Sequence, residues 1–270
     1  MAHDGFRALH VPGDPLLIPN PWDVGSARIL AAMGFQALAT TSAGMAYGLG
    51  KAEGTANREE TLDHCRVLSA ATPLPVSAGL EKGFADDPDG VAETIRLAVG
   101  TGLAGASIED FTGDAANPAY DFDLSVARVK AAVDAARAAD PNFVLTARCD
   151  VLQYEDWPLS DVIDRLNAYA DAGADVVYAP GLYDLDSIRT VCRAARAPVN
   201  VVMGMPGRTF TIPELADAGV ARISVGSVLA RLAYTSLIRA GEEMRDRGAF
   251  SFTGDALGFQ VLDEMMTRTP

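Results

Sequence analysis

One stretch in the second half of the chain shows the repeating pattern that decides the fold: residues 160–180 read SDVIDRLNAYADAGADVVYAP. Its first part, Ser160–Asp171, is rich in residues that favour a helix, and Gly173 can close that helix in the left-handed conformation. A short apolar run, Asp175–Pro180, comes next and is typical of a buried strand. The stretch therefore predicts a helix followed directly by a strand.

The same alternation extends in both directions along the chain. Strand-like runs fall at eight places: Leu16–Asn20, Ala37–Ser42, Pro75–Leu80, Gly105–Asp110, Phe143–Arg148, Asp175–Pro180, Pro198–Met203 and Arg222–Ser227. Helix-like stretches lie between them: Val24–Met33, Arg58–Ala71, Asp89–Gly100, Leu124–Ala139, Ser160–Asp171, Leu185–Ala195 and Ile212–Ala218. Other helix-like stretches also end in a glycine before a new strand, at Gly34, Gly102 and Gly219.

Eight strand-then-helix units with buried strands predict an α/β fold with a parallel sheet. Eight units in about 250 residues close most naturally into a (β/α)8 TIM barrel, with an open doubly wound sheet as the alternative. We expect residues 1–270 to form one barrel domain, with 228–270 as a C-terminal helical extension. The extension has more apolar positions than an eighth barrel helix needs, so it either packs against another subunit or caps the barrel floor.

Composition and charge exclude several classes of function. The chain has 270 residues, 49% of them hydrophobic, and a net charge of −14, which repels phosphate backbones and argues against nucleic-acid binding. No apolar run is long enough for a membrane span, and residues 1–15 lack one long enough for a signal peptide. The three cysteines are widely spaced and form no CxxC motif, which argues against disulfides or zinc and favours a reducing cytoplasm.

The residues at the C-terminal ends of the strands are the candidate site, because TIM-barrel enzymes place their chemistry there. Several carboxylates fall at these ends together with one arginine: Asp23, Glu81, Glu109, Asp110 and Arg148. Such a set suits a hard cation such as Mg²⁺ and an anionic substrate gripped by the guanidinium. Alternatively, Arg148 only neutralises Glu109, Asp110 holds a neighbour or a backbone amide, and Asp23 caps a helix.

Two further features refine this expectation. The small polar run Thr41–Gly44 can present backbone N–H groups and hydroxyls to an oxyanion. The histidines, His3, His10 and His64, all lie outside the strand ends, which makes a Ser-His-Asp triad or a histidine metal site improbable. We expect Cys149 to pack in the barrel wall, since it should point away from the side of Arg148.

Four segments together resemble the isocitrate lyase/phosphoenolpyruvate mutase superfamily. They are Leu17–Ala27, Thr40–Gly44, Ser107–Asp110 and Thr146–Asp150, which read LIPNPWDVGSA, TTSAG, SIED and TARCD. The resemblance covers essentially the whole chain. It implies a (β/α)8 barrel whose last helix is exchanged between paired subunits in homodimers or homotetramers, a Mg²⁺ cofactor, and an enolate-type intermediate in the cleavage or formation of a C–C or P–C bond.

The resemblance also implies roles for individual residues. Arg148 binds the substrate carboxylate and stabilises the enolate, and Glu109 holds a water of the Mg²⁺ shell. The remaining candidates are substrate-binding residues, Thr41, Ser42, Ala43, Gly44 and Trp22, and acids near the metal, Glu81 and Glu53. Gly79 stands where the family has the first aspartate of an Asp-x-Asp pair, usually a direct metal ligand.

The function implied is that of a carbon-carbon lyase that cleaves, decarboxylates or hydrolyses a small α-oxo or 2-hydroxy carboxylic acid through an enolate-like intermediate. The segment after the third strand, Glu81–Asp86, lacks the Lys-Arg-Cys-Gly-His loop of the isocitrate lyase branch, so true isocitrate or methylisocitrate lyase activity is not expected. One alternative is a phosphonopyruvate-type P–C mutase or hydrolase. The other is a non-catalytic member of the family, for which Gly79 is the main support.

Overall fold

The computed structural model describes residues 5–204, 207 and 209–268. Eight parallel strands form one sheet in the order β1-β8-β7-β6-β5-β4-β3-β2. Their bounds are β1 Leu16–Ile18, β2 Leu38–Ala39, β3 Val76–Gly79, β4 Gly105–Glu109, β5 Val144–Arg148, β6 Val176–Tyr178, β7 Val199–Val202 and β8 Arg222–Ser224. Between β1 and β2, the amide of Ala39 donates to the carbonyl of Pro19 at 3.0 Å. The TIM-barrel prediction is confirmed, and the open doubly wound sheet is wrong.

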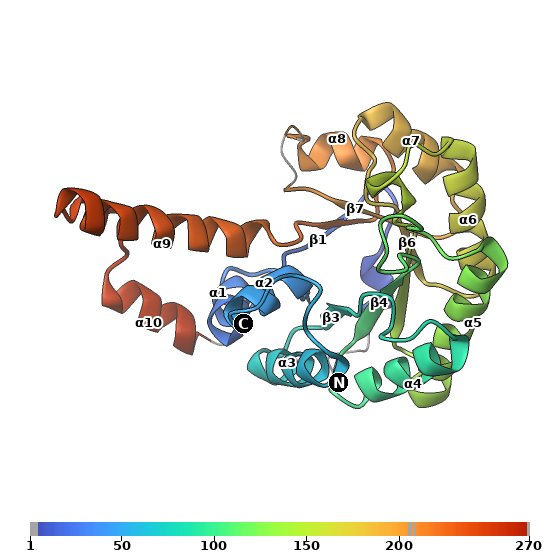
Figure 1. The fold of residues 1–270 in the computed structure, drawn as a ribbon, viewed down its shortest axis with the longest axis horizontal. Helices are drawn as coiled ribbons and strands as arrows, with labels where there is room; N and C mark the ends of the chain where they lie inside the picture. Colours follow the sequence, from blue (N-terminus) through green and yellow to red (C-terminus); the bar gives the residue numbers. More distant parts are fainter. Residues whose placement is uncertain (1–4, 205–206, 208, 269–270) are drawn as a thin grey trace.

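Helices surround the strands (Figure 1). Their bounds are α1 Val24–Ala32, α2 Ser42–Gly48, α3 Arg58–Ala71, α4 Pro88–Val99, α5 Phe122–Ala139, α6 Leu159–Asp171, α7 Leu185–Ala194, α8 Ile212–Asp217, α9 Val228–Arg247 and α10 Phe259–Thr267. Short 3-10 helices lie at Arg7–Leu9, Val151–Gln153 and Ser251–Asp255. The predicted strand Ala37–Ser42 was too long, because Thr41 caps α2 and its side chain accepts from the amide of Gly44.

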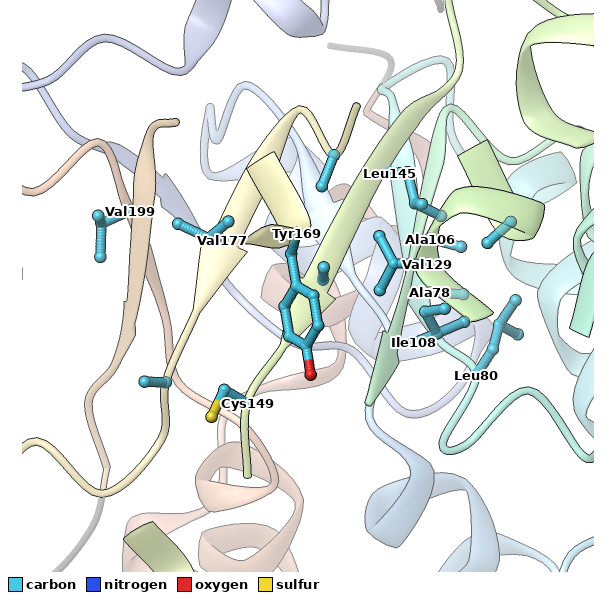
Figure 2. Packing of buried hydrophobic residues seen from close by; sticks show 14 of the residues in the cluster. Ala78, Leu80, Ala106, Ile108, Val129, Leu145, Cys149, Tyr169, Val177 and Val199 are labelled. Carbon is cyan, nitrogen blue, oxygen red and sulfur yellow. The ribbon is translucent and has the colours of Figure 1, made fainter. Parts of the chain in front are cut away.

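The outward faces of the strands form the main core with the helices. Ala78, Ile108, Leu145 and Val177 alternate with inward residues on four neighbouring strands and pack among side chains such as Tyr169 of α6 (Figure 2). Cys149 lies in this core with no exposed surface, which confirms its predicted packing role. The strands are thus held from outside, which leaves the inside of the barrel available for polar side chains.

A second apolar cluster fills the barrel interior at the N-terminal ends of the strands. It consists of Phe6, Leu16, Ile18, Ala37, Ala104, Val144 and Val176. Phe6 immediately precedes the first 3-10 helix, so the N-terminal segment closes the barrel floor. The alternative that the C-terminal helices cap this floor is therefore wrong.

The C-terminal helices extend away from the barrel. In Figure 1, α9 projects from it and α10 returns toward α1, against which it packs. Ala230 is the buried residue of α9, near its start, and large apolar side chains farther along are exposed. Within the described residues, no helix combines the length and apolar character that crossing a membrane requires.

Candidate active site

A cavity of about 210 Å³ opens at the C-terminal ends of the strands and reaches into the barrel. Small inward side chains make room for it: Ala39, Ser77, Gly79 and Ser107. A larger hollow of about 460 Å³ lies between α4 and α5 on the outer wall, where none of the strand-end candidates reaches it. We therefore place the site in the smaller cavity.

The cavity wall contains part of the predicted set. Thr41, Ser42, Ala43, Glu53, Gly79 and Arg148 all line it. Four other predicted residues, Trp22, Gly44, Glu81 and Glu109, lie at or just after strand ends at the same end of the barrel but are not part of the cavity wall. Gly44 is a packing position, because a Cβ there would lie 2.6 Å from Thr41 Cγ2 and 2.8 Å from Trp22 Cβ.

Arg148, the last residue of β5, is the centre of a charged cluster. Its Nη1 lies 2.9 Å from Glu109 Oε2, and its Nε and Nη2 donate to the two carboxylate oxygens of Asp150 at 3.0 and 2.7 Å. The ring of Tyr178 lies under the guanidinium, with its centroid 4.9 Å from Cζ. Arg148 thus forms an ion-pair network and also faces the cavity.

The protonation of this cluster follows from its burial. Burial raises the pKa of Glu109 to about 8, and the charge of Arg148 opposes that rise. Burial likewise raises the pKa of Tyr178 to about 12. Burial thus favours the protonated forms of Glu109 and Tyr178, and Asp150 lies within ion-pair distance of Arg148.

Asp150 and Tyr178 are functional candidates that the sequence analysis did not assign. Asp150 lies two residues after Arg148, so its side chain falls on the same face of the chain; this spacing was the available signal. Tyr178 pairs in register with Arg148 on the neighbouring strand. That contact depends on the order of the strands, which only the fold reveals.

Two of the carboxylates that were open to alternative readings have structural roles. Asp110 accepts hydrogen bonds from the amide of Asp150 at 2.8 Å, from Tyr169 Oη at 2.8 Å and from Arg165 Nη1 at 3.1 Å. Asp23 caps α1, and its side chain accepts from the amide of Ser26 at 2.7 Å. Asp110 positions the Asp150 backbone, and Asp23 is a helix cap.

The segment after β2 supplies backbone donors to the cavity. Because Ser42 and Ala43 form the first turn of α2, their amides have no acceptor within the helix. Both residues line the cavity, and Thr41 holds the turn through Gly44. The segment can therefore receive an oxyanion, as the sequence predicts.

The acids near the predicted metal position fit a cation that keeps much of its water. Glu53 and Glu81 have no ion-pair partner among the described residues, and the charge of Glu53 adds to burial in raising the pKa of Glu81. Glu81 also has a left-handed backbone, with φ of +48°, a conformation that is often found at functional sites. In the described part of the chain, no three His, Cys, Asp or Glu side chains converge into a site of protein ligands alone. Mg²⁺ commonly binds through one or two carboxylates and several waters, which matches this pair.

Comparison with known proteins agrees with this arrangement. The phosphoenolpyruvate phosphomutase family model matches residues 6–245. The 2-methylisocitrate lyase of Salmonella typhimurium is 31% identical, covering 97% of this chain and 88% of its own. A lyase/mutase structure from Burkholderia cenocepacia has a TM-score of 0.94 and 52% identity over 99% of this chain and 96% of its own.

A third relative carries a reaction product. The structure of oxaloacetate acetylhydrolase in complex with oxalate has a TM-score of 0.87 and 26% identity, covering 98% of this chain and 93% of that one. All these matches extend over most of the chain. The chain belongs to the phosphoenolpyruvate phosphomutase family, within the isocitrate lyase/phosphoenolpyruvate mutase superfamily.

Proposed function

We propose that the protein is a lyase that cleaves a carbon-carbon bond in a small α-oxo or 2-hydroxy carboxylic acid through an enolate-like intermediate. The observation that carries this proposal is the position of Arg148, which faces the cavity among buried acids. The relatives support it, since one is a 2-methylisocitrate lyase and another an oxaloacetate acetylhydrolase.

The residues of the cavity have complementary roles in this chemistry. Arg148 binds the substrate carboxylate and offsets the negative charge that develops as the bond breaks. Asp150 holds the guanidinium through two hydrogen bonds and offsets part of its positive charge. The amides of Ser42 and Ala43 hold the oxo-acid end. All these donors are fixed before the substrate arrives, so they need little rearrangement during the reaction.

Glu53 and Glu81 are the residues that would hold Mg²⁺, with Glu109 contacting its water shell. When bound, the metal would supply Lewis-acid polarisation of the substrate oxygens. Gly79 adds no ligand, so the proposed site depends on these acids and on water. The role proposed for Arg148 does not depend on this metal site, because Arg148 is not one of the proposed ligands.

A direct test is to incubate the protein and Mg²⁺ with oxaloacetate, malate, 2-methylisocitrate and phosphonopyruvate, and to follow each by NMR. We expect C–C cleavage of an oxo or hydroxy acid. Arg148→Gln should lower kcat/KM by roughly 10²- to 10³-fold while circular dichroism stays unchanged. Full activity in this variant would refute the role of Arg148, and absence of turnover on the whole panel would contradict a lyase.

The family match favours one alternative, a P–C mutase or hydrolase, because its model is that of phosphoenolpyruvate phosphomutase. In the same assay, conversion of phosphonopyruvate alone would select this alternative. The third possibility, a non-catalytic member, draws support from Gly79 at a usual ligand position. It would be selected by binding of these acids without turnover.

We further propose that the protein acts as a homodimer or homotetramer in the cytoplasm, possessing no nucleic-acid or membrane partner. The support for assembly is the set of exposed apolar side chains on the C-terminal helices: Leu232, Leu237, Ile238, Phe250, Leu257 and Phe259. Exposed apolar side chains in this number commonly pack against another subunit. The cysteines are free thiols, in keeping with a reducing compartment.

A further inference from the structure

A second arginine, Arg222 of β8, lines the inner part of the cavity and has no role in the chemistry proposed above. Only 6% of the residue is exposed. Its Nε donates to Asn200 Oδ1 at 2.8 Å, and its Nη1 lies 3.4 Å from His10 Nε2. Neither partner is a carboxylate, and no described acid lies within ion-pair distance of this guanidinium.

The histidine beside Arg222 adds no charge. His10 Nδ1 lies 3.0 Å from the carbonyl oxygen of Phe6, so this nitrogen carries the ring proton. Nε2 is then left as the acceptor that faces Arg222. Burial, aided by the charge of Arg222, lowers the pKa of His10 to about 4. The ring is therefore neutral at pH 7.

The two arginines of the cavity thus differ in their charge balance. Arg148 contacts the carboxyl groups of Glu109 and Asp150, whereas Arg222 contacts only neutral acceptors. Burial lowers the pKa of Arg222 to about 10, which still leaves it charged at neutral pH. A buried charge without a counter-ion is costly, and a bound anion would remove that cost.

Strand register relates the two arginines. Arg148 pairs with Tyr178, Tyr178 with Asn200, and Asn200 with Arg222, so the four residues form one row across β5 to β8. The ends of this row are three strand spacings apart, roughly 14 Å along the wall. Arg148 is the last residue of β5 and Arg222 the first of β8, so their long side chains reach the cavity from opposite ends.

One donor of Arg222 remains available. Its Nη2 donates to no described residue, since the contacts of this side chain are those of Nε and Nη1. It is also absent from the fully buried unpaired atoms of the described chain, which are Thr146 Oγ1 and Arg165 Nε. Nη2 therefore keeps some accessible surface. Because Arg222 lines the cavity, a ligand bound there can reach this donor.

We propose that Arg222, oriented by Asn200 and His10, binds a second carboxylate of the substrate at the inner end of the cavity and makes the enzyme select short dicarboxylates over monocarboxylates. This inference rests on the proposed lyase function. It adds that Arg222 determines which class of carboxylic acid the enzyme accepts. It differs from a purely structural role, in which Arg222 would only connect β7, β8 and the N-terminal segment.

The test compares two unreactive four-carbon probes, succinate and butyrate, by isothermal titration calorimetry on the full chain at pH 7.5. We expect the wild type to bind succinate at least roughly tenfold more tightly, as a charge-assisted hydrogen bond provides. Arg222→Gln should lower succinate affinity to the butyrate level without changing butyrate affinity. Arg222→Lys should retain part of the preference, because it keeps the charge.

A second variant, Asn200→Asp, places an internal carboxylate on the guanidinium in nearly the same volume. If Arg222 lacks a counter-ion, this variant should melt at a higher temperature and lose the preference for succinate. A lower melting temperature, or a preserved preference, would overturn the proposal. This variant tests the role of Arg222 even if Arg222→Gln does not fold.

Failure of this inference can be distinguished from failure of the proposed function. Turnover of oxo acids with equal binding of succinate and butyrate would remove the role of Arg222 and leave the lyase proposal standing. Succinate selectivity that depends on Arg222, without turnover of any acid, would support the anion site and refute the lyase.

Discussion

The guanidinium of Arg148 is held in a fork by Asp150, with Nε–Oδ1 and Nη2–Oδ2 distances of 3.0 and 2.7 Å. Two parallel hydrogen bonds fix the plane of an arginine as well as its position. Asp150 is itself anchored, since its amide donates to Asp110 at 2.8 Å. The orientation of Arg148 therefore depends on a chain of contacts that begins in the buried core.

This relationship predicts that Asp150 is a positioning residue. Asp150→Asn keeps the size of the side chain but weakens the fork, so kcat should fall by roughly 10- to 100-fold, as for other residues that orient a catalytic group. Substrate KM should change much less. Steady-state kinetics on the preferred oxo acid measure this split, with the exposed Asp156→Asn in the same loop as a matched control. Equal losses in both variants would refute the assignment.

Asp110 should matter chiefly for stability. Asp110→Ala leaves the Arg165 guanidinium buried without its carboxylate and also removes the acceptor of Tyr169. Breaking such a buried pair costs about 3–5 kcal/mol. Urea denaturation measures the change, and the control is Asp164→Ala, an exposed acid on the same helix as Arg165. A loss below 1 kcal/mol, on the order of a surface substitution, would show that water replaces the pair.

The sequence was sufficient for the barrel but not for every local boundary. All eight strands were predicted in order, because buried parallel strands are continuous apolar runs that end sharply at helices. Helix α2 was missed, since Ser42–Gly48 contains two glycines and looks like a turn. Two contacts favour the helical conformation of this segment: the local hydrogen bond that caps it at Thr41, and the tertiary packing of Gly44 against Trp22.

The site was predictable where it depends on strand ends. Arg148 and Glu109 were found because they end β5 and β4. Asn200 and Arg222 were not, because a buried strand gives no periodic sign of which polar residue faces inward. Their place in the cavity depends on the register between β7 and β8, which the sequence pattern does not reveal.

Glu109 predicts a specific pH dependence of stability. Its folded pKa is about 8, compared with an ordinary value of 4.5, so between these values the native state keeps a proton that the unfolded chain has lost. The stability from this group is complete below pH 4.5 and is lost as pH rises through 8. The slope approaches about 1.4 kcal/mol per pH unit within that window.

Glu109→Gln isolates this contribution, because glutamine does not titrate. We expect the wild type to lose stability relative to the variant between pH 5 and 8, with a constant difference above about pH 9. Free energies of unfolding from urea titrations at several pH values measure it. Parallel curves for the two proteins would show that Glu109 is ionised in the native state throughout.

Gly79 predicts how the metal affinity can be changed. A Cβ added there would meet only Ser107 Oγ, at 3.9 Å, so the position has room for a side chain. Gly79→Asp should tighten Mg²⁺ binding by at least roughly tenfold, because it adds a carboxylate to Glu53 and Glu81. Calorimetry with MgCl₂ alone measures this, with Glu81→Gln expected to weaken binding. EDTA should abolish turnover and Mg²⁺ should restore it; activity unaffected by EDTA would remove the metal from the reaction.

The C-terminal helices predict self-association. In the 20-residue helix α9, Leu237 is 64% exposed and Ile238 is 59% exposed. Burying such side chains against a second copy is favourable by about 25 cal/mol per Å² of apolar area, whereas a single exposed helix gains nothing from them. We therefore expect light scattering after size-exclusion chromatography to give two or four times the mass of one chain.

The double variant Leu237→Glu/Ile238→Glu should shift this mass to that of the monomer, because it places charges inside the proposed contact. Val67→Glu is the matched control: Val67 is 53% exposed on α3, far along the chain from α9, and its replacement should leave the mass unchanged. If the wild type already elutes as a monomer at micromolar concentration, α9 does not hold two copies together, and its apolar side chains need another explanation. If the control alone dissociates the assembly, the contact lies on the α3 side of the barrel instead.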